Sequence, residues 1–270
     1  TGAATEGRRR VMRFEPNATS PNIIGGFNGN SVTAGAVGGV IAGGGATTAT
    51  NRVTDDYGAI LGGINNQAGD NAGATTNKPF AVVAGGNGNV ASGSYSFAMG
   101  HTTTASGDTA TAFGSHTVAS GENSFASGYQ SVASGWFSTA MGDSAVASGY
   151  AAAAFGSRTI ASGFYSTALG VVSTASGHFS TAIGAGSTAA GESSIATGLG
   201  LTLDASADRS FGFHANTVAA DRNMTISDAD VAVFGNTDLW LANNDGNPSE
   251  LRFFEGYNAA GAFPNTANYT

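Results

Sequence analysis

Glycine occupies every seventh position from Gly93 to Gly198, sixteen times in succession and without an exception. Alanine stands two positions before each of these glycines, from Ala91 to Ala196. A seven-residue period is typical of coiled coils, but a coiled coil needs large apolar residues at two positions of each repeat. A glycine inside a helix also costs about 1 kcal/mol. The period therefore predicts a short β-strand and a turn in every seven residues, with glycine at the bend.

Successive units alternate, so the full repeat has 14 residues. Odd units mostly end in Ala-Ser-Gly, and most even units end in alanine, a large apolar residue and glycine, as in 98–100. Two strands and two turns per 14 residues form one coil of a parallel β-solenoid, in which each coil stacks on the next. At about 4.8 Å per coil, the regular repeat would be roughly 38 Å long. The expected turn glycines include Gly93, Gly100, Gly107, Gly114, Gly121, Gly128, Gly135 and Gly142.

Alternation along a strand places the alanine on one face and the residues one and three before each glycine on the other. This second face carries small pairs such as Val132 and Ser134 in odd units, and large pairs such as Phe97 and Met99 in even units. Small side chains opposite bulky ones are the volume match that a thin interior needs. We therefore expect this face inside the coil and the alanines outside. The same reasoning places inside the threonines Thr104, Thr111, Thr139, Thr167, Thr174 and Thr181.

Aromatic residues recur in the turns after the odd units. We call this set the aromatic edge: Tyr95, Trp136, Phe137, Tyr150, Phe164, Tyr165 and Phe179. The turns after the even units are mostly polar, with His101, His116, Gln130, Asp143, Ser144 and Arg158. The aromatic edge has two interpretations: it is buried against identical chains in an oligomer, or it is a row of stacking platforms for sugars or a protein partner. Exposed apolar stripes of this length usually mark an interface, which favours the oligomer.

The unit Asn-Ser-Phe-Ala-Ser-Gly at 123–128 and its relatives at 138–142 and 180–184 resemble the YadA-like head repeat of trimeric autotransporter adhesins. Similar repeats occur in bacteriophage tail-fibre-like proteins. The resemblance covers residues 90–198. It implies a left-handed parallel β-roll that packs with two identical chains into an obligate homotrimer and holds out an attachment surface. The odd units depart from the family consensus, which often has isoleucine or valine where they have serine.

The repeat divides the chain into four predicted regions: an N-terminal strand and linker (1–21), irregular glycine-rich solenoid coils with loops (22–89), the regular β-roll (90–200) and a smaller C-terminal β region (201–270). In the second region, Asn28, Asn65 and Asn87 follow glycine pairs and fit left-handed turns. Segments 46–57 and 69–79 are expected to protrude as loops, where binding usually resides. Strands are expected after Gly198 at 201–203, 224–226, 231–234, 239–241 and 251–254.

Composition and motifs argue against several classes of function. A net charge of −8 speaks against nucleic acid as a partner, and no apolar run is long enough for a transmembrane helix. The four histidines are scattered, and no nucleophile elbow, phosphate loop or metal motif occurs. We expect no catalytic residue, cofactor or metal. The oxygen-rich segment 244–250 fits a hairpin turn better than a calcium site.

The sequence thus predicts a non-enzymatic, homotrimeric, extracellular fibre segment that attaches to a cell or surface by displaying many weak contacts to a glycan or protein ligand. The location would be a cell surface or a virion fibre. Since the chain opens without methionine, we expect it to be a piece of a longer protein. One alternative is a purely structural shaft of a filament or phage tail fibre. Others are a carbohydrate-active β-solenoid and, on threonine-rich faces, ice binding.

Overall fold

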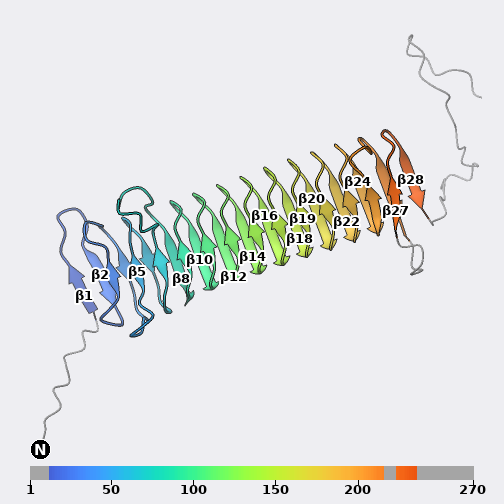
Figure 1. Cartoon of the computed structure of the whole chain (residues 1–270). Helices are drawn as coiled ribbons and strands as arrows, with labels where there is room; N and C mark the ends of the chain where they lie inside the picture. The colour runs from blue at the N-terminus through green and yellow to red at the C-terminus, as the bar shows by residue number, and fades with distance from the viewer. Residues whose placement is uncertain (1–11, 216–222, 236–270) are drawn as a thin grey trace, which may run out of the picture.

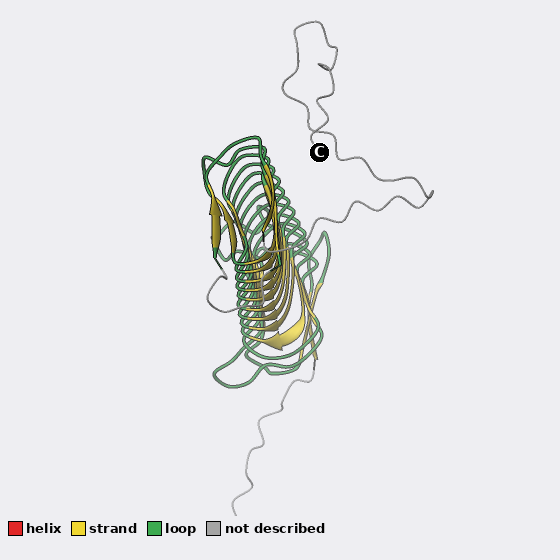
Figure 2. Ribbon diagram, turned by 90° about the vertical axis from the view of Figure 1, so that its right-hand side faces the viewer, coloured by secondary structure: helices red, strands yellow, loops and turns green. Residues whose placement is uncertain are grey.

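The computed structural model describes residues 12–215 and 223–235, which wind into an elongated all-β rod (Figure 1). No helix occurs in these two ranges. The chain passes alternately through two sheets, so that neighbouring strands within each sheet come from successive coils. Seen along the rod, the coils superimpose into one flattened section with loops at its edges (Figure 2). The predicted parallel β-solenoid of 14-residue coils is confirmed.

Sheet A holds fifteen strands: Met12–Glu15 (β1), Asn22–Gly25 (β2), Val40–Ile41 (β4), Ala59–Ile60 (β6), Val82–Asn87 (β8), Phe97–His101 (β10), Thr111–Ser115 (β12), Phe125–Tyr129 (β14), Thr139–Asp143 (β16), Ala153–Ser157 (β18), Thr167–Val171 (β20), Thr181–Ala185 (β22), Ile195–Leu199 (β24), Phe211–His214 (β26) and Ala232–Gly235 (β28). Sheet B holds thirteen: Ser31–Val32 (β3), Arg52–Val53 (β5), Gln67–Ala68 (β7), Val90–Ala91 (β9), Thr104–Ala105 (β11), Val118–Ala119 (β13), Val132–Ala133 (β15), Val146–Ala147 (β17), Ile160–Ala161 (β19), Thr174–Ala175 (β21), Thr188–Ala189 (β23), Leu201–Leu203 (β25) and Met224–Ile226 (β27).

The regular coils stack in exact register. Ala98 lies beside Ala112, which lies beside Ala126, and the same residue types continue through the repeat. All strand pairs in the described residues are parallel except one: β1 runs antiparallel to β2 and covers that end of sheet A. This edge strand is only four residues long and carries the charged Arg13 and Glu15, two features that disfavour pairing with another sheet.

The alanine column lies inside the coil, so the predicted orientation of the strand faces was wrong. Ala98, Ala140 and the other alanines of the column are completely buried. The interior is filled by these alanines together with Ser and Thr at the corners, such as Thr103 and Ser138, which are also fully buried. The two sheets lie so close that side chains of this size fill the space between them, and Phe or Met must therefore point outward.

The residues that flank each alanine consequently lie on the outer faces of the two sheets. This corrects the placement of the six threonines. Thr104 and Thr174 lie on the outer face of sheet B, and Thr111, Thr139, Thr167 and Thr181 lie on that of sheet A. Phe125 interrupts the threonines of sheet A, and valines interrupt those of sheet B. Neither face carries the unbroken threonine array that ice binding would use.

Two kinds of glycine serve the repeat for different reasons. Gly100 and its even-unit equivalents have φ values that side chains rarely adopt, +132° for Gly100. Gly135 and the other odd-unit glycines of the regular coils do not need positive φ, but a Cβ on Gly135 would lie 2.0 Å from the carbonyl oxygen of Gly149 in the next coil. The sequence argument from backbone freedom therefore applies to the even units, whereas the odd units need glycine because successive coils approach closely.

A ladder of buried asparagines joins the irregular coils to the regular ones. The series consists of Asn30, Asn51, Asn66 and Asn89. The Oδ1 atom of each of the first three accepts a hydrogen bond from the backbone N–H of the next asparagine, with N–O distances of 2.9 to 3.0 Å. The Oδ1 atom of Asn89 accepts from the backbone N–H of Thr103 at 3.0 Å. Each Nδ2 donates to two glycine carbonyls, as Asn66 does to Gly62 and Gly86. Every amide of the ladder is satisfied, which buried polar groups require.

Outside the regular repeat the structure differs from the sequence expectations at several points. Of the three asparagines expected in left-handed turns, only Asn65 has positive φ, at 56°. Segment 46–57 is not a continuous loop, because it contains β5. After Gly198, β25 to β28 extend the same two sheets. The strands expected at 239–241 and 251–254, and segment 244–250, lie outside the described residues.

Candidate interaction surfaces

On the outer face of sheet A, each strand from β10 to β26 carries a large apolar residue at its first or third position, and we call this row of residues the apolar face. In strand register, Met141 lies beside Phe155, which lies beside Leu169, followed by Ile183. Phe97, Met99, Phe113, Phe125 and Ile195 belong to the same face. Met141, Leu169 and Ile183 are exposed by 40%, 43% and 38%. Sequence reasoning missed this surface because it placed these side chains inside.

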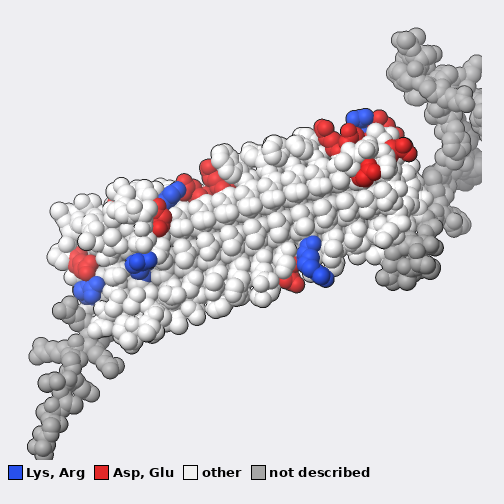
Figure 3. Space-filling model, in the orientation of Figure 1, with Lys and Arg blue, Asp and Glu red and all other residues white. Residues whose placement is uncertain are grey.

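Charged side chains are sparse along the rod. On the face shown in Figure 3, Lys, Arg, Asp and Glu gather near the ends and margins, and most of the long surface carries none. The first and third residues of each sheet A strand from β10 to β26, which point outward on the apolar face, carry no charge, and the exposed Asp143 is the fifth residue of β16. A long exposed apolar strip without charges is the kind of surface that another protein covers.

The structure brings together five of the seven aromatic-edge residues. The ring centroid of Tyr150 lies 5.5 Å from that of Phe137, 6.2 Å from that of Phe164 and 5.5 Å from that of Tyr165. Tyr165 stacks on Phe179 at 5.5 Å with an interplanar angle of 3°. Except for the half-buried Tyr150, these rings are exposed. They pack on one another along the rod, so several ring faces are covered by neighbouring rings.

The remaining two members of the aromatic edge lie apart from these five. Trp136 is exposed and forms no ring pair within residues 12–215 and 223–235. Tyr95 stacks on Phe80, which stacks on Tyr57, with centroids 4.9 and 5.1 Å apart. Sequence reasoning missed Phe80 and Tyr57. Both occur two residues before a sheet A strand, as Tyr95 does, and this common spacing was the available signal.

The aromatic edge also coincides with strained corners of the backbone. Tyr95, Phe137, Tyr165 and Phe179 have φ between 54° and 59°. Non-glycine residues seldom adopt this left-handed conformation, which costs roughly 1 to 2 kcal/mol per residue. Interactions between neighbouring aromatic rings, worth about 0.5 to 1.5 kcal/mol per pair, offset part of this cost.

Loop 69–79 projects from the irregular coils but is fixed at both ends. At its start, Asp55 Oδ2 accepts a hydrogen bond from the backbone N–H of Asp70 at 2.9 Å. Near its end, Lys78 Nζ lies 2.7 Å from Asp108 Oδ1 in the regular repeat. The hydrogen bond from Lys78 holds the pKa of the Asp108 carboxyl below its ordinary value, and a backbone hydrogen bond from Ser94 adds to this effect. The loop is therefore presented in a defined position.

The described residues contain no group of three His, Asp or Glu side chains placed to hold a metal ion. Among these residues there is also no helix with the length and apolar character needed to cross a bilayer. The histidines occur separately or in contact with aromatic rings, as His101 does with His116 and His178 with Phe164. The surfaces that stand out are the apolar face, the aromatic edge and the loops of the N-terminal coils.

Comparison with known families identifies the regular repeat. The family model of the YadA head domain repeat (2 copies) matches six windows: 91–117, 119–145, 133–159, 142–165, 161–187 and 175–200. No curated protein matches the chain. The matched windows span β9 to β24, the stretch in which the alanine column and the 14-residue register are unbroken. Residues 91–200 are therefore a run of YadA-like head repeats.

Proposed function

We propose that this chain is a segment of a non-enzymatic, trimeric, extracellular adhesin or fibre that attaches to a cell or surface. The observation that carries the proposal is the apolar face, together with the YadA-like repeats that form it. YadA-type head domains are parts of adhesins and form trimers. In the proposed trimer, each chain turns its apolar face toward the common axis.

The apolar face suits this interface better than the aromatic edge does. Each sheet A strand from β10 to β26 contributes an apolar residue to it, at the first or the third position of the strand, so three copies can align along its whole length. The aromatic edge is interrupted at Thr109 and Asn123, which take the equivalent corner positions between Tyr95 and Phe137. Two large parallel strips meeting over several coils bury far more apolar area than an interrupted row of corners. The aromatic edge then remains on the outside of the trimer.

The rod form supports attachment by display. Every coil is hydrogen-bonded to the next over both sheets, so the solenoid forms a rigid support. The largest described loops lie in the N-terminal part of the rod (Figure 1). Three copies at one end would engage a surface at several points at once, and avidity rather than one tight pocket would provide retention.

A pair of charge substitutions tests the proposal. Met141→Glu with Leu169→Glu places two carboxylates in the apolar face, whereas Ser148→Glu with Ser162→Glu places the same charges on the exposed outer face of sheet B. Each protein is applied in solution at the same concentration to intact cells and to glycan-coated surfaces, and the amount of bound protein is measured. We expect the wild type and the sheet B variant to be trimeric and to adhere, and the apolar-face variant to be monomeric and to adhere weakly.

Three outcomes would contradict the proposal. Adhesion by the monomeric variant as strong as that of the wild type would show that trimer formation and multivalency are not needed. A wild-type trimer that adheres to none of the surfaces would favour the structural shaft. Release of soluble sugar from a polysaccharide by the wild type would instead identify a carbohydrate-active enzyme.

A further inference from the structure

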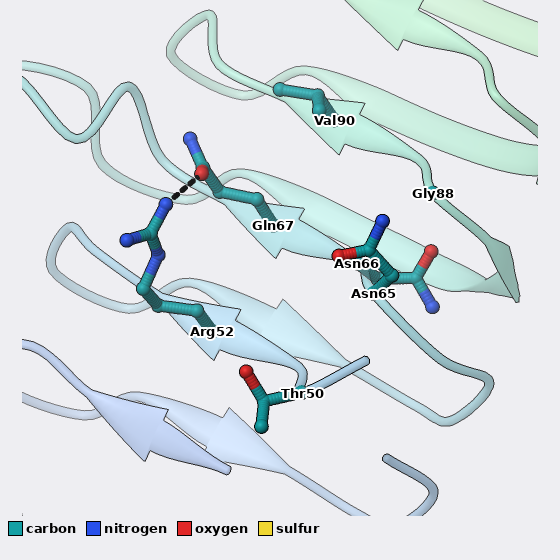
Figure 4. A pocket seen from close by; sticks show the side chains of 7 residues that line it. All are labelled: Thr50, Arg52, Asn65, Asn66, Gln67, Gly88 and Val90. Carbon is teal, nitrogen blue, oxygen red and sulfur yellow. Dashed lines mark hydrogen bonds between the residues drawn. The ribbon is translucent and has the colours of Figure 1, made fainter. Parts of the chain in front are cut away.

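The outer face of sheet B contains a polar hollow in the N-terminal coils. It encloses about 370 Å³ and is lined by Thr50, Arg52, Asn65, Asn66, Gln67, Gly88 and Val90 (Figure 4). This volume falls within the range of small-molecule sites, roughly 300 to 1,000 Å³. The lining comes from three successive coils, because Arg52 lies on β5, Gln67 on β7 and Val90 on β9.

One cation dominates the hollow. In strand register Arg52 lies beside Gln67, and its Nη2 donates a hydrogen bond to Gln67 Oε1. The Gln67 amide is held in turn, since its Nε2 donates to the carbonyl of Gly69 at 2.9 Å. Among the described residues, no carboxylate forms an ion pair with Arg52. The guanidinium has five N–H donors, so most of its hydrogen-bonding capacity is available to a ligand.

The rest of the lining is fixed by the fold. Asn66 belongs to the buried ladder, and all its amide bonds are made within the rod, so it forms a rigid floor. Asn65 stands at a left-handed corner with its backbone N–H bonded to the carbonyl of Ala49, which directs its side chain outward. Figure 4 shows the Arg52 and Gln67 side chains at one end of the hollow and the Asn65 amide at the other, with Thr50 alongside.

This polar lining is specific to the N-terminal coils. The column that holds Arg52 and Gln67 continues in register as Val90, Thr104 and Val118 in the regular repeat. The Arg52 guanidinium and the Gln67 amide replace the valine and threonine side chains that this column carries in those coils. Because the hollow lies on sheet B, a trimer formed through the apolar face of sheet A leaves it open on the outside.

We propose that the hollow binds a saccharide that carries a carboxylate. Arg52 binds the carboxylate, since the planar guanidinium matches it with two parallel hydrogen bonds. Gln67, Asn65 and Thr50 supply the donors and acceptors that sugar hydroxyls require, and Val90 contacts the apolar face of the ring. This inference rests on the proposed function and gives it a ligand class: each trimer presents three such sites to an acidic glycan.

Direct binding of two simple sugars to the full chain tests this assignment. D-Glucuronic acid and D-glucose differ in the carboxylate, and each is titrated while binding is followed by saturation-transfer NMR. We expect glucuronic acid to bind with a Kd on the order of 1 mM, and glucose at least about tenfold more weakly, because hydrogen bonds to charged groups are stronger than neutral ones.

Three variants locate the binding. Arg52→Gln removes the cation, and Gln67→Glu keeps the side-chain size but pairs the guanidinium with a carboxylate. Both should weaken glucuronic acid binding about tenfold or more. Arg158→Gln makes the same chemical change at an exposed arginine outside the hollow and should leave binding unchanged. Circular dichroism confirms that each variant keeps the β-solenoid, and Gln67→Glu gives a second test if Arg52→Gln fails to fold.

The assignment is overturned if the wild type binds neither sugar, if it binds both equally, or if both hollow variants bind like the wild type. Adhesion assays on the same proteins keep this result separate from the proposed function. If the wild type binds no sugar and Arg52→Gln still adheres, the saccharide site is refuted and the attachment function is kept. If the wild-type trimer binds sugar but does not adhere, the saccharide site is kept and the attachment function is refuted.

Discussion

Replacing Gly135 by alanine should destabilise the rod, although its backbone angles suit any residue. The new Cβ would lie 2.0 Å from the oxygen and 2.6 Å from the carbon of the Gly149 carbonyl in the next coil. An ordinary contact needs about 3.4 Å, so the two coils must separate by more than 1 Å. Gly135 N–H and Ser134 N–H both bond to Ala147 O, at 3.2 and 2.9 Å. Losing or stretching each of these buried hydrogen bonds costs about 1 to 2 kcal/mol. The substitution should therefore lower the free energy of unfolding by about 2 to 4 kcal/mol.

Gly62→Ala is the matched control for this substitution. Gly62 also lies outside the positive-φ region, and a Cβ there meets nothing within 4 Å. That variant should be neutral or more stable by about 0.4 to 1 kcal/mol, because alanine restricts the unfolded chain. The stability of both variants is measured by urea denaturation at one protein concentration, with circular dichroism as the signal. A Gly135→Ala midpoint equal to that of Gly62→Ala would refute the close approach of successive coils.

Three further changes follow from the same structure. Val172 is a β-branched residue at φ 57°, so Val172→Asn should raise the thermal midpoint, by relieving about 1 kcal/mol of strain; an unchanged or lower midpoint would contradict this. Asn66→Leu leaves the buried N–H of Asn89 without its acceptor and should cost about 3 kcal/mol in urea denaturation, whereas a loss below 1 kcal/mol would show that the ladder is dispensable. Because the pKa of Asp108 is lowered in the folded state, its contribution is fully present above the ordinary value of 3.8 and is lost as the pH falls through the folded value. Wild type should therefore be slightly more stable than Asp108→Asn at pH 7, and this difference should vanish near pH 2; a difference independent of pH would exclude the carboxylate as its cause.

The repeat period was enough to predict the coil, but it could not decide which face points inward. Alternation shows only that the alanine and its neighbours lie on opposite faces of the strand. Which of the two faces points inward depends on the width of the gap between the sheets. The volume argument assumed a gap wide enough for Met and Phe. The stronger signal was the lack of any substitution in the alanine column, since a completely closed interior tolerates no larger residue at Ala140.

The features of the N-terminal coils were less accessible to sequence reasoning. Coil length varies there, so no fixed spacing reveals that Asn30, Asn51, Asn66 and Asn89 occupy the same corner of successive coils. The hollow at Arg52 likewise depends on three coils of unequal length. By contrast, the aromatic residues of the regular repeat could be predicted to lie along one edge, because the constant period there fixes their relative positions.

The native mass of the chain in solution is the most direct test of the proposed trimer. The apolar face is exposed on a single chain, and in the trimer two identical chains cover it. Light scattering after size exclusion should give about 80 kDa, the mass of three chains of 26.5 kDa. Met141→Glu with Leu169→Glu should lower this mass to that of one chain, and Ser148→Glu with Ser162→Glu should not. A stable, soluble wild-type monomer of 26.5 kDa would contradict the trimer and the role assigned to the apolar face.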